Sequence, residues 1–105
     1  MTFIELIAHL AGQRPIEPLY REHGVTVDTP GVTVYLREVL AVDADIALLG
    51  VDKTDGDIRY VQDGVQWLYC LELDLVEEMV AEGVADGMSP AAIAARVLDY
   101  ACYDA

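Results

Sequence analysis

The chain has 105 residues, of which 54% are hydrophobic, and this is enough apolar material for one packed core. It carries 19 Asp plus Glu against 6 Lys plus Arg, so the formal net charge at pH 7 is −13. A surface of that sign repels nucleic-acid phosphates and anionic lipid headgroups, which argues against direct binding to either and favours basic partners. We expect a single folded domain over residues 1–105.

The start of the chain predicts a helix rather than a leader peptide. Thr2 can cap a helix over Phe3 to Ala11, whose apolar residues recur at helical spacing, and Gly12 follows its end. Glu5 and His9 interrupt the apolar run, and the segment has neither a positive beginning nor a small-residue cleavage site. No stretch approaches the roughly 20 apolar residues of a membrane span. We therefore expect a cytoplasmic protein.

The middle of the chain has the pattern of β-hairpins. A short helical turn over Pro18 to His23, ended by Gly24, precedes it. Strand-forming residues then alternate with turn residues, and the predicted strand segments are Val25 to Val27, Val32 to Leu40, Ile46 to Val51, Ile58 to Gln62 and Val65 to Leu71. Asp63-Gly64 between the last two is a strong hairpin signal, because both positions of a tight turn need a positive φ. The pattern predicts an antiparallel β-meander of about four strands.

Alternation along two of these strands predicts which face of the sheet is buried. One set of alternate residues is uniformly apolar, and we expect it to face the core: Val32, Val34, Leu36, Val65, Trp67, Tyr69 and Leu71. The other set is mixed in polarity: Thr33, Tyr35, Arg37, Val39, Gln66, Leu68 and Cys70. We expect this second face to be partly covered by a helix or used as a contact surface.

Two helices are predicted after the sheet. The first carries an apolar stripe at helical spacing that stops at Gly87: Leu73, Val76, Met79, Val80 and Val84. Ser89-Pro90 begins the second, with serine at the cap and proline in the first turn. The predicted fold is therefore α+β, with an N-terminal helix and two C-terminal helices packed on the meander.

The segment from Asp52 to Asp57 has the acid content of a calcium loop but not its spacing. With Gly56 at the glycine position of an EF-hand, Val51 falls on the first ligand position and Gln62 on the closing one. We therefore expect no metal and no other cofactor, and interpret the aspartates as turn residues. Because we expect these carboxylates to be exposed, the candidate partner-binding residues also include Asp52, Asp55 and Asp57.

Few residues are available for covalent catalysis. Ser89, the only serine, is expected to cap a helix, and the two histidines, His9 and His23, are far in sequence from Cys70 and Cys102. Nothing in this spacing favours a catalytic pair or a zinc site. We expect two buried, reduced thiols and no catalytic residue, and thus no enzyme.

The most informative acid lies on the first of the two C-terminal helices. Asp74, Glu78 and Glu82 fall at i, i+4 and i+8, with Glu77 beside them, and this helix contains no Lys or Arg. Like charges at this spacing cost a few tenths of a kcal/mol per pair. A solvated helix face is the ordinary interpretation of such a run. In a chain of net charge −13, the alternative is a surface that repels nucleic acid and attracts its binders.

In overall profile, as a short, compact, acidic chain without a catalytic motif, the sequence resembles small phage-encoded inhibitors, including anti-CRISPR and DNA-mimic proteins. The resemblance covers composition along the whole chain and involves no motif, so it assigns no role to a residue. It implies an inhibitor whose acidic surface blocks the basic, nucleic-acid-binding groove of a partner. The carboxylates that would stand in for phosphates are Asp74, Glu77, Glu78 and Glu82.

Two alternatives stay open at this point. An immunity protein, an antitoxin or an oligomer subunit, a homodimer included, would use an apolar patch near Tyr35, Tyr60 and Leu68. Adaptation to a salty cytoplasm would make the acid a general property of the surface without a specific site.

Overall fold

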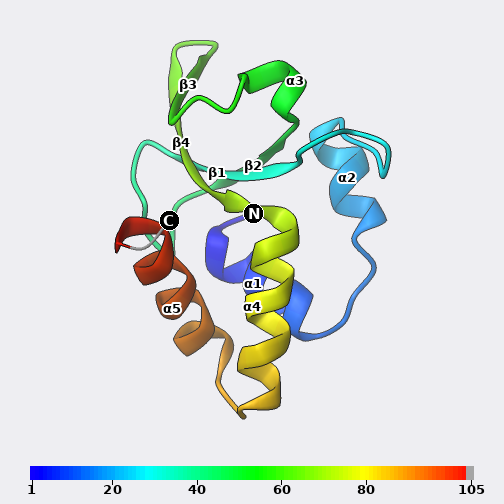
Figure 1. The fold of residues 1–105 in the computed structure, drawn as a ribbon, viewed down its shortest axis with the longest axis vertical. Coiled ribbons are helices and arrows are strands. Elements are labelled where there is room, and N and C mark those ends of the chain that lie inside the picture. Colours follow the sequence, from blue (N-terminus) through cyan, green and yellow to red (C-terminus); the bar gives the residue numbers. More distant parts are fainter. Residues whose placement is uncertain (104–105) are drawn as a thin grey trace.

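The structure, a computed structural model, describes residues 1–103 and has the predicted α+β class. The N-terminal helix, a four-stranded antiparallel sheet and two C-terminal helices are all present (Figure 1). The elements in chain order are α1 (Phe3–Ala11), α2 (Glu17–His23), β1 (Thr33–Arg37), β2 (Ile46–Leu49), α3 (Val51–Thr54), β3 (Arg59–Gln62), β4 (Val65–Glu72), α4 (Leu73–Ala85) and α5 (Pro90–Tyr103).

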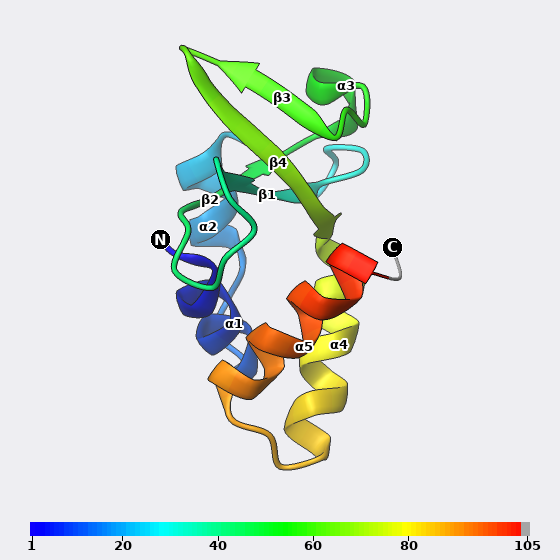
Figure 2. The same cartoon turned by 90° about the vertical axis from the view of Figure 1, so that its left-hand side faces the viewer.

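The strands are arranged as two hairpins side by side. Their order in the sheet is β2-β1-β4-β3, and all three neighbouring pairs are antiparallel. This order differs from that of a meander in chain order, since β2 and β3 lie at opposite edges. The reason is α3, which follows β2 directly and carries the chain past one face of the sheet to the far edge (Figure 2). The central pair, β1 with β4, joins the hairpins.

Local signals in the sequence are confirmed at the helix starts and at the tight turn. Thr2 and Glu5 form a capping box at α1, and the Ala92 amide donates to Ser89 Oγ at 3.2 Å at the start of α5. Asp63 and Gly64 have φ values of 53° and 77°, as a two-residue hairpin turn requires.

Several predicted strand segments are shorter than expected. The segment Val25 to Val27 is not a strand, because the Thr26 amide donates to Thr29 Oγ1 at 2.9 Å and closes a turn. The strand predicted to run to Leu40 ends at Arg37, since the next residue, Glu38, has a φ of 65° and turns the chain away. Val51, predicted to end a strand, begins α3 instead.

A β-bulge between β1 and β4 changes which side chains face the core. The two strands pair in register up to Leu71, after which Tyr35 pairs with Tyr69 and Cys70 is skipped. Cys70 and Leu71 consequently both lie in the main core, whereas Trp67 and Tyr69 pack with Tyr35 on the other face. The prediction that Trp67 and Tyr69 share a face with Leu71 is wrong, since strict alternation holds only for unbroken pairing.

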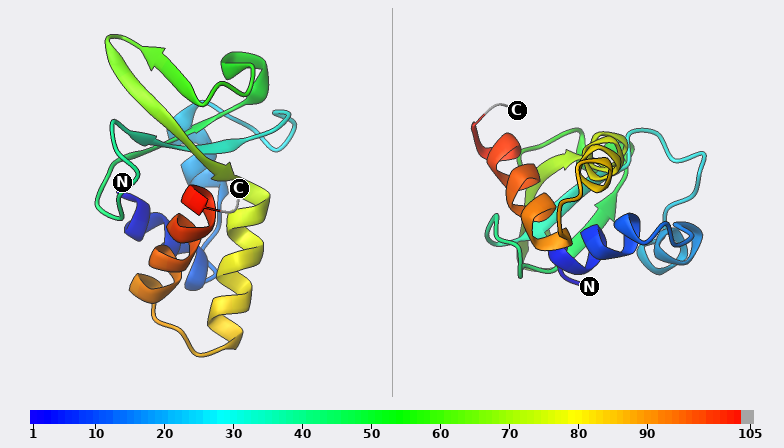
Figure 3. Two further views of the ribbon diagram at one scale, coloured as in Figure 1. Left: turned by 60° about the vertical axis from the view of Figure 1, so that its left-hand side comes forward. Right: turned by 90° about the horizontal axis from the view of Figure 1, so that it is seen from below.

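The main core lies between one face of the sheet and a layer of three helices. Helices α1, α4 and α5 form that layer, and α2 packs beside β2 (Figure 3). The fully buried side chains of the main core come from both the sheet and the helices: Phe3, Leu6, Ile7, Val34, Leu36, Leu48, Val76, Ile93 and Val97. Within residues 1–103, no helix combines the length and apolarity needed to cross a membrane.

The closest approach of α4 to α5 depends on Gly83. A Cβ at this position would lie 2.5 Å from Cγ1 of Ile93, whose side chain is fully buried. An alanine in a helix is ordinarily favoured over glycine by about 0.5–1 kcal/mol, but overpacking a core costs about 1–3 kcal/mol. We therefore expect Gly83→Ala to lower the free energy of unfolding by about 1 kcal/mol in urea denaturation.

A double-mutant cycle with Ile93→Ala separates this clash from other effects. Ile93→Ala alone should cost about 2–5 kcal/mol, and less in the Gly83→Ala background, because the new methyl group fills part of the cavity. Additive losses, or a Gly83→Ala protein more stable than the wild type, would contradict this account of the helix contact.

Candidate acidic binding surface

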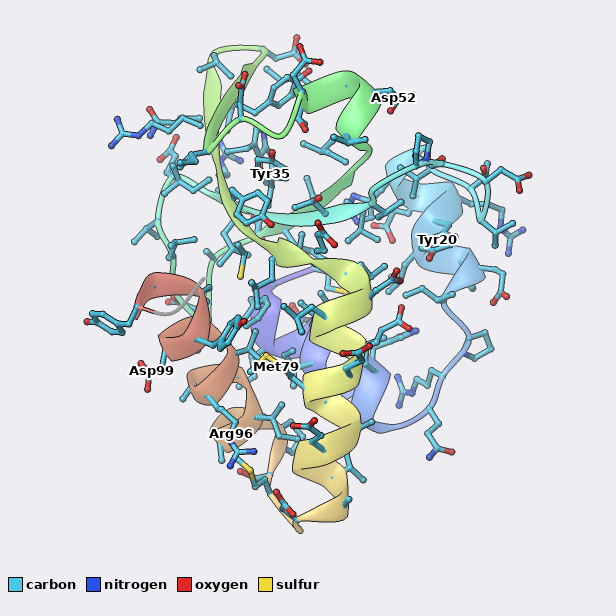
Figure 4. All side chains as sticks on the ribbon, in the orientation of Figure 1. Tyr20, Tyr35, Asp52, Met79, Arg96 and Asp99 are labelled. Atoms are coloured by element: carbon cyan, nitrogen blue, oxygen red, sulfur yellow. The ribbon has the colours of Figure 1, made fainter. Side chains whose placement is uncertain are left out.

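Helix α4 presents its acidic residues because its other side is fixed in the core. Leu73, Val76, Val80 and Gly83 are buried, so the opposite side of the helix faces solvent (Figure 4). The exposed carboxylates on that side are Asp74, Glu78 and Glu82, with Glu77 on the flank. The structure thus brings together all four residues of the predicted row.

The density of charge along this row is close to that of a nucleic-acid strand. Asp74 and Glu82 are about 12 Å apart along the helix axis, since eight residue steps each rise about 1.5 Å. Counting Glu77 on the flank with the three outward residues, four carboxylates over that length give about one negative charge per 3–4 Å of helix axis, against about 3.4 Å for one strand of DNA. The row can therefore meet basic side chains at a spacing similar to that of phosphates.

No basic residue of the chain lies on α4 itself. All six lie on other segments: Arg14, Arg21, Arg37, Lys53, Arg59 and Arg96. Within residues 1–103 the ion pair found is Arg96 with Asp86, at 3.8 Å and largely in solvent. Such a pair contributes little to stability, and it does not involve the carboxylates of the row on α4.

Glu77 differs from the other three residues in its surroundings. Partial burial raises the pKa of its carboxyl group above the usual value, and the nearby Asp74 raises it further. The same two carboxylates act on Tyr20 of α2, whose phenol pKa is raised first by burial and then by Glu77 and Asp74. Glu77 thus lies toward the end of α1 and the start of α2, while Asp74 lies near Tyr20 of α2.

Glu77 borders a groove that no pattern in the sequence predicts. The groove has a volume of about 560 Å³ and lies between the end of α1, the connection to α2 and the side of α4. Figure 1 shows that connection passing alongside α4. Apolar side chains of Leu10, Ile16, Val80 and Val84 line it. Val84 belongs to the apolar stripe predicted for this helix, but in the structure its side chain is 42% exposed.

The aspartates of the α3 segment form a separate group. Asp52, Asp55 and Asp57 are exposed, but α3 lies on the opposite side of the sheet from α4 (Figures 1 and 2). Asp55 ends α3 with a left-handed φ of 54°, and the Asp57 carbonyl oxygen accepts a hydrogen bond from the Tyr35 hydroxyl at 2.7 Å. These residues shape the turn, and the structure does not bring them to the row on α4.

The predicted apolar contact patch is divided between the two faces of the sheet. Tyr35 is fully buried beneath the α3 segment and makes edge-to-face contacts with Tyr60 and Tyr69, with ring centres 6.4 and 5.9 Å apart. Leu68 pairs with Leu36 and therefore points to the helix side. Tyr35, Tyr60 and Leu68 thus do not form one surface.

The nucleophile candidates also lie apart. Cys70 is buried in the core, and burial raises the pKa of its thiol to about 12, so it stays protonated. Cys102 is a free thiol but is exposed, and the prediction of two buried thiols is wrong for it. Leu98 is the last buried residue of α5, and Cys102 lies one turn beyond it. His9 Nε2 is 2.8 Å from the carbonyl oxygen of Pro15.

No described group of side chains has the composition of a metal centre. Over residues 1–103, three or more His, Cys, Asp or Glu side chains do not gather in a way that could hold a metal ion. Compared with known protein families, with curated proteins and with solved structures, the chain has no match in any of the three.

The row on α4 should cost stability, because its carboxylates repel one another. We expect Glu78→Gln with Glu82→Gln to raise the free energy of unfolding by about 0.5 kcal/mol at low salt, since two like-charged i, i+4 contacts are relieved. The gain should disappear above about 0.5 M salt, where such contacts are screened. Urea unfolding at the two salt concentrations measures both effects.

A matched control is Asp43→Asn with Asp45→Asn, which removes the same charge from an exposed loop. Its effect should be smaller than that of the helix pair. Equal gains from the two double variants would show that the repulsion is a general property of the surface, as in adaptation to high salt.

His23 predicts a pH dependence of stability. Its Nε2 is buried and has no hydrogen-bond partner among residues 1–103. Burial lowers the pKa of the ring below 6.5, an effect that Glu22 partly offsets. The unfolded chain therefore binds the proton more tightly, and the contribution of neutral His23 is lost as the pH falls from about 6.5 through the folded pKa. His23→Gln should lose less stability than the wild type between pH 7 and 5. The free energy of unfolding is measured for both proteins across this pH range. Equal losses in the two proteins would refute this role of His23.

Proposed function

We propose that this protein is a cytoplasmic, non-enzymatic inhibitor whose acidic surface occupies the basic, nucleic-acid-binding groove of a protein partner, as anti-CRISPR and DNA-mimic proteins do. The observation that carries the proposal is the exposed row on α4, formed by Asp74, Glu77, Glu78 and Glu82. Its charge spacing resembles that of a nucleic-acid strand, and no base on α4 neutralises it. A surface of this kind attracts basic grooves and speeds their encounter.

Inhibition would follow from occupancy of the groove rather than from chemistry. Arg and Lys side chains that normally contact phosphates would instead contact the carboxylates of α4, so that nucleic acid and inhibitor exclude each other. Each contact is at the surface and is weakened by salt. The net charge of the whole chain, −13, would add long-range attraction, but it would not determine where the partner binds.

The proposal is tested by neutralising the row without changing its shape. The protein and its variant Asp74→Asn, Glu78→Gln, Glu82→Gln are used as baits in host extract at about 0.1 and 0.5 M salt. We expect the wild type to retain a basic nucleic-acid-binding protein at low salt, to lose it at high salt, and to lose it to competing nucleic acid. The row variant should retain at least about tenfold less, corresponding to about 1.4 kcal/mol.

The control bait carries Asp43→Asn, Asp45→Asn and Asp63→Asn, which remove the same charge at exposed positions outside α4. It should retain the partner nearly as well as the wild type. Equal losses from the two triple variants would mean that net charge, and not the row, governs binding. Retention that is the same at both salt concentrations would reject an electrostatic interface altogether.

A second candidate is an oligomer subunit or an immunity protein that binds through the sheet edge. The observation that favours it is the exposure of Ile58 and Val61, at 75% and 65%, on and beside the edge strand β3. Exposed apolar residues on an edge strand are suited to pairing with another chain. Such binding is apolar and would persist at salt concentrations that screen the row on α4.

A further inference from the structure

The groove beside α4 combines an apolar floor with an acidic margin. Leu10 and Ile16 form one wall, and Val80 and Val84 form the other. An open apolar surface next to charged groups is typical of sites that bind another protein. The groove shares Glu77 with the row on α4, but the outward carboxylates of Asp74, Glu78 and Glu82 do not line it.

The charges at its margin favour a cation from outside the chain. Glu17 and Glu77 both line the groove, and the one basic side chain that lines it is Arg14. Glu77 lies about one helical turn from Asp74, and α4 carries no basic residue to offset these two negative charges. A Lys or Arg placed between Glu17 and Glu77 would relieve this repulsion.

The walls of the groove determine what kind of segment can occupy it. Val80 and Val84 lie on α4 and Leu10 lies on α1, whose backbone groups pair within the helices. In the connection after α1, the amides of Gln13 and Arg14 already donate to carbonyl oxygens of α1. An extended peptide would find no strand edge here and would leave its own backbone groups unpaired, whereas a helix pairs them internally. The wall from Glu77 to Ala85 is about 12 Å long, which matches about two helical turns.

We propose that this groove binds a short amphipathic helix of the basic protein partner, with apolar side chains on its floor and Lys or Arg beside Glu17 and Glu77. The inference rests on the proposed function and adds to it an apolar anchor and a specified segment of the partner. A second copy of this chain is a poor occupant, because its net charge of −13 would be repelled by the same margin.

The test uses the full chain, labelled with ¹⁵N, and synthetic helical peptides of about 16 residues. The main peptide has leucines at i, i+3, i+4 and i+7 with arginines on both flanks. One control peptide replaces the leucines with serine and keeps the arginines, and the other replaces the arginines with glutamine. We expect the main peptide to shift the amide resonances of Leu10, Ile16, Val80 and Val84 and to bind at least about tenfold more tightly than either control.

Two matched protein variants locate the site. Val84→Arg fills the groove, whereas Val61→Arg makes the same change on β3, and both positions are exposed enough to accept it without unfolding. Binding of the main peptide should fall at least about tenfold for Val84→Arg and change less than about twofold for Val61→Arg.

The outcomes separate the groove from the acidic row. If the serine control binds as tightly as the main peptide and shifts only Asp74, Glu78 and Glu82, the groove proposal is overturned while the acidic surface stands. If Val84→Arg and Val61→Arg bind the main peptide equally, the groove is likewise excluded. If neither arginine-containing peptide shifts any resonance at low salt, both the groove and the acidic row fail as binding surfaces.

Discussion

The antiparallel pairing of β1 with β4 is the contact on which the rest of the structure depends. It joins two hairpins that each have one central and one edge strand, and it forms the middle of the face on which α1, α4 and α5 pack. An isolated hairpin is marginally stable in water, whereas four strands with an apolar face can be stable. The bulge in this pair then decides which aromatic side chains leave the main core.

Strand β4 also determines which side of α4 faces solvent. β4 ends at Glu72 and α4 begins at Leu73, so no connecting loop separates the central strand from the acidic helix. Leu73 and Val76 are buried at once against the sheet, and this orients the remaining turns of α4. The solvent-facing position of Glu78 and Glu82 is therefore a consequence of core packing.

Local signals predicted the elements well, because the interactions that define them are short in sequence. Thr2 with Glu5, Ser89 before Pro90, and Asp63-Gly64 each depend on residues within one turn. The row on α4 was predictable for the same reason, since helical spacing alone determines that Asp74, Glu78 and Glu82 share a face. These features need no knowledge of the tertiary fold.

The features that sequence patterns missed depend on contacts between distant segments. The bulge that separates Tyr69 from Leu71 exists only in the β1–β4 pair, and α3 could not be distinguished from a turn over its short length. The groove arises where Ile16, outside any helix interior, lies near Val84, so no periodicity within either segment predicts it. The placement of Tyr35 and Leu68 on opposite faces of the sheet likewise depends on the pairing of β1 with β4.

The direct passage from β4 into α4 has a consequence for the entropy of association. Side chains on a helix whose backbone is held by the core lose mainly rotamer freedom when they are bound, whereas acidic segments that fold on binding must also order their backbone. The ordering of a free segment consumes several kcal/mol of interaction energy. Carboxylates carried on a helix anchored in this way are preorganised, and more of their interaction energy remains available as affinity.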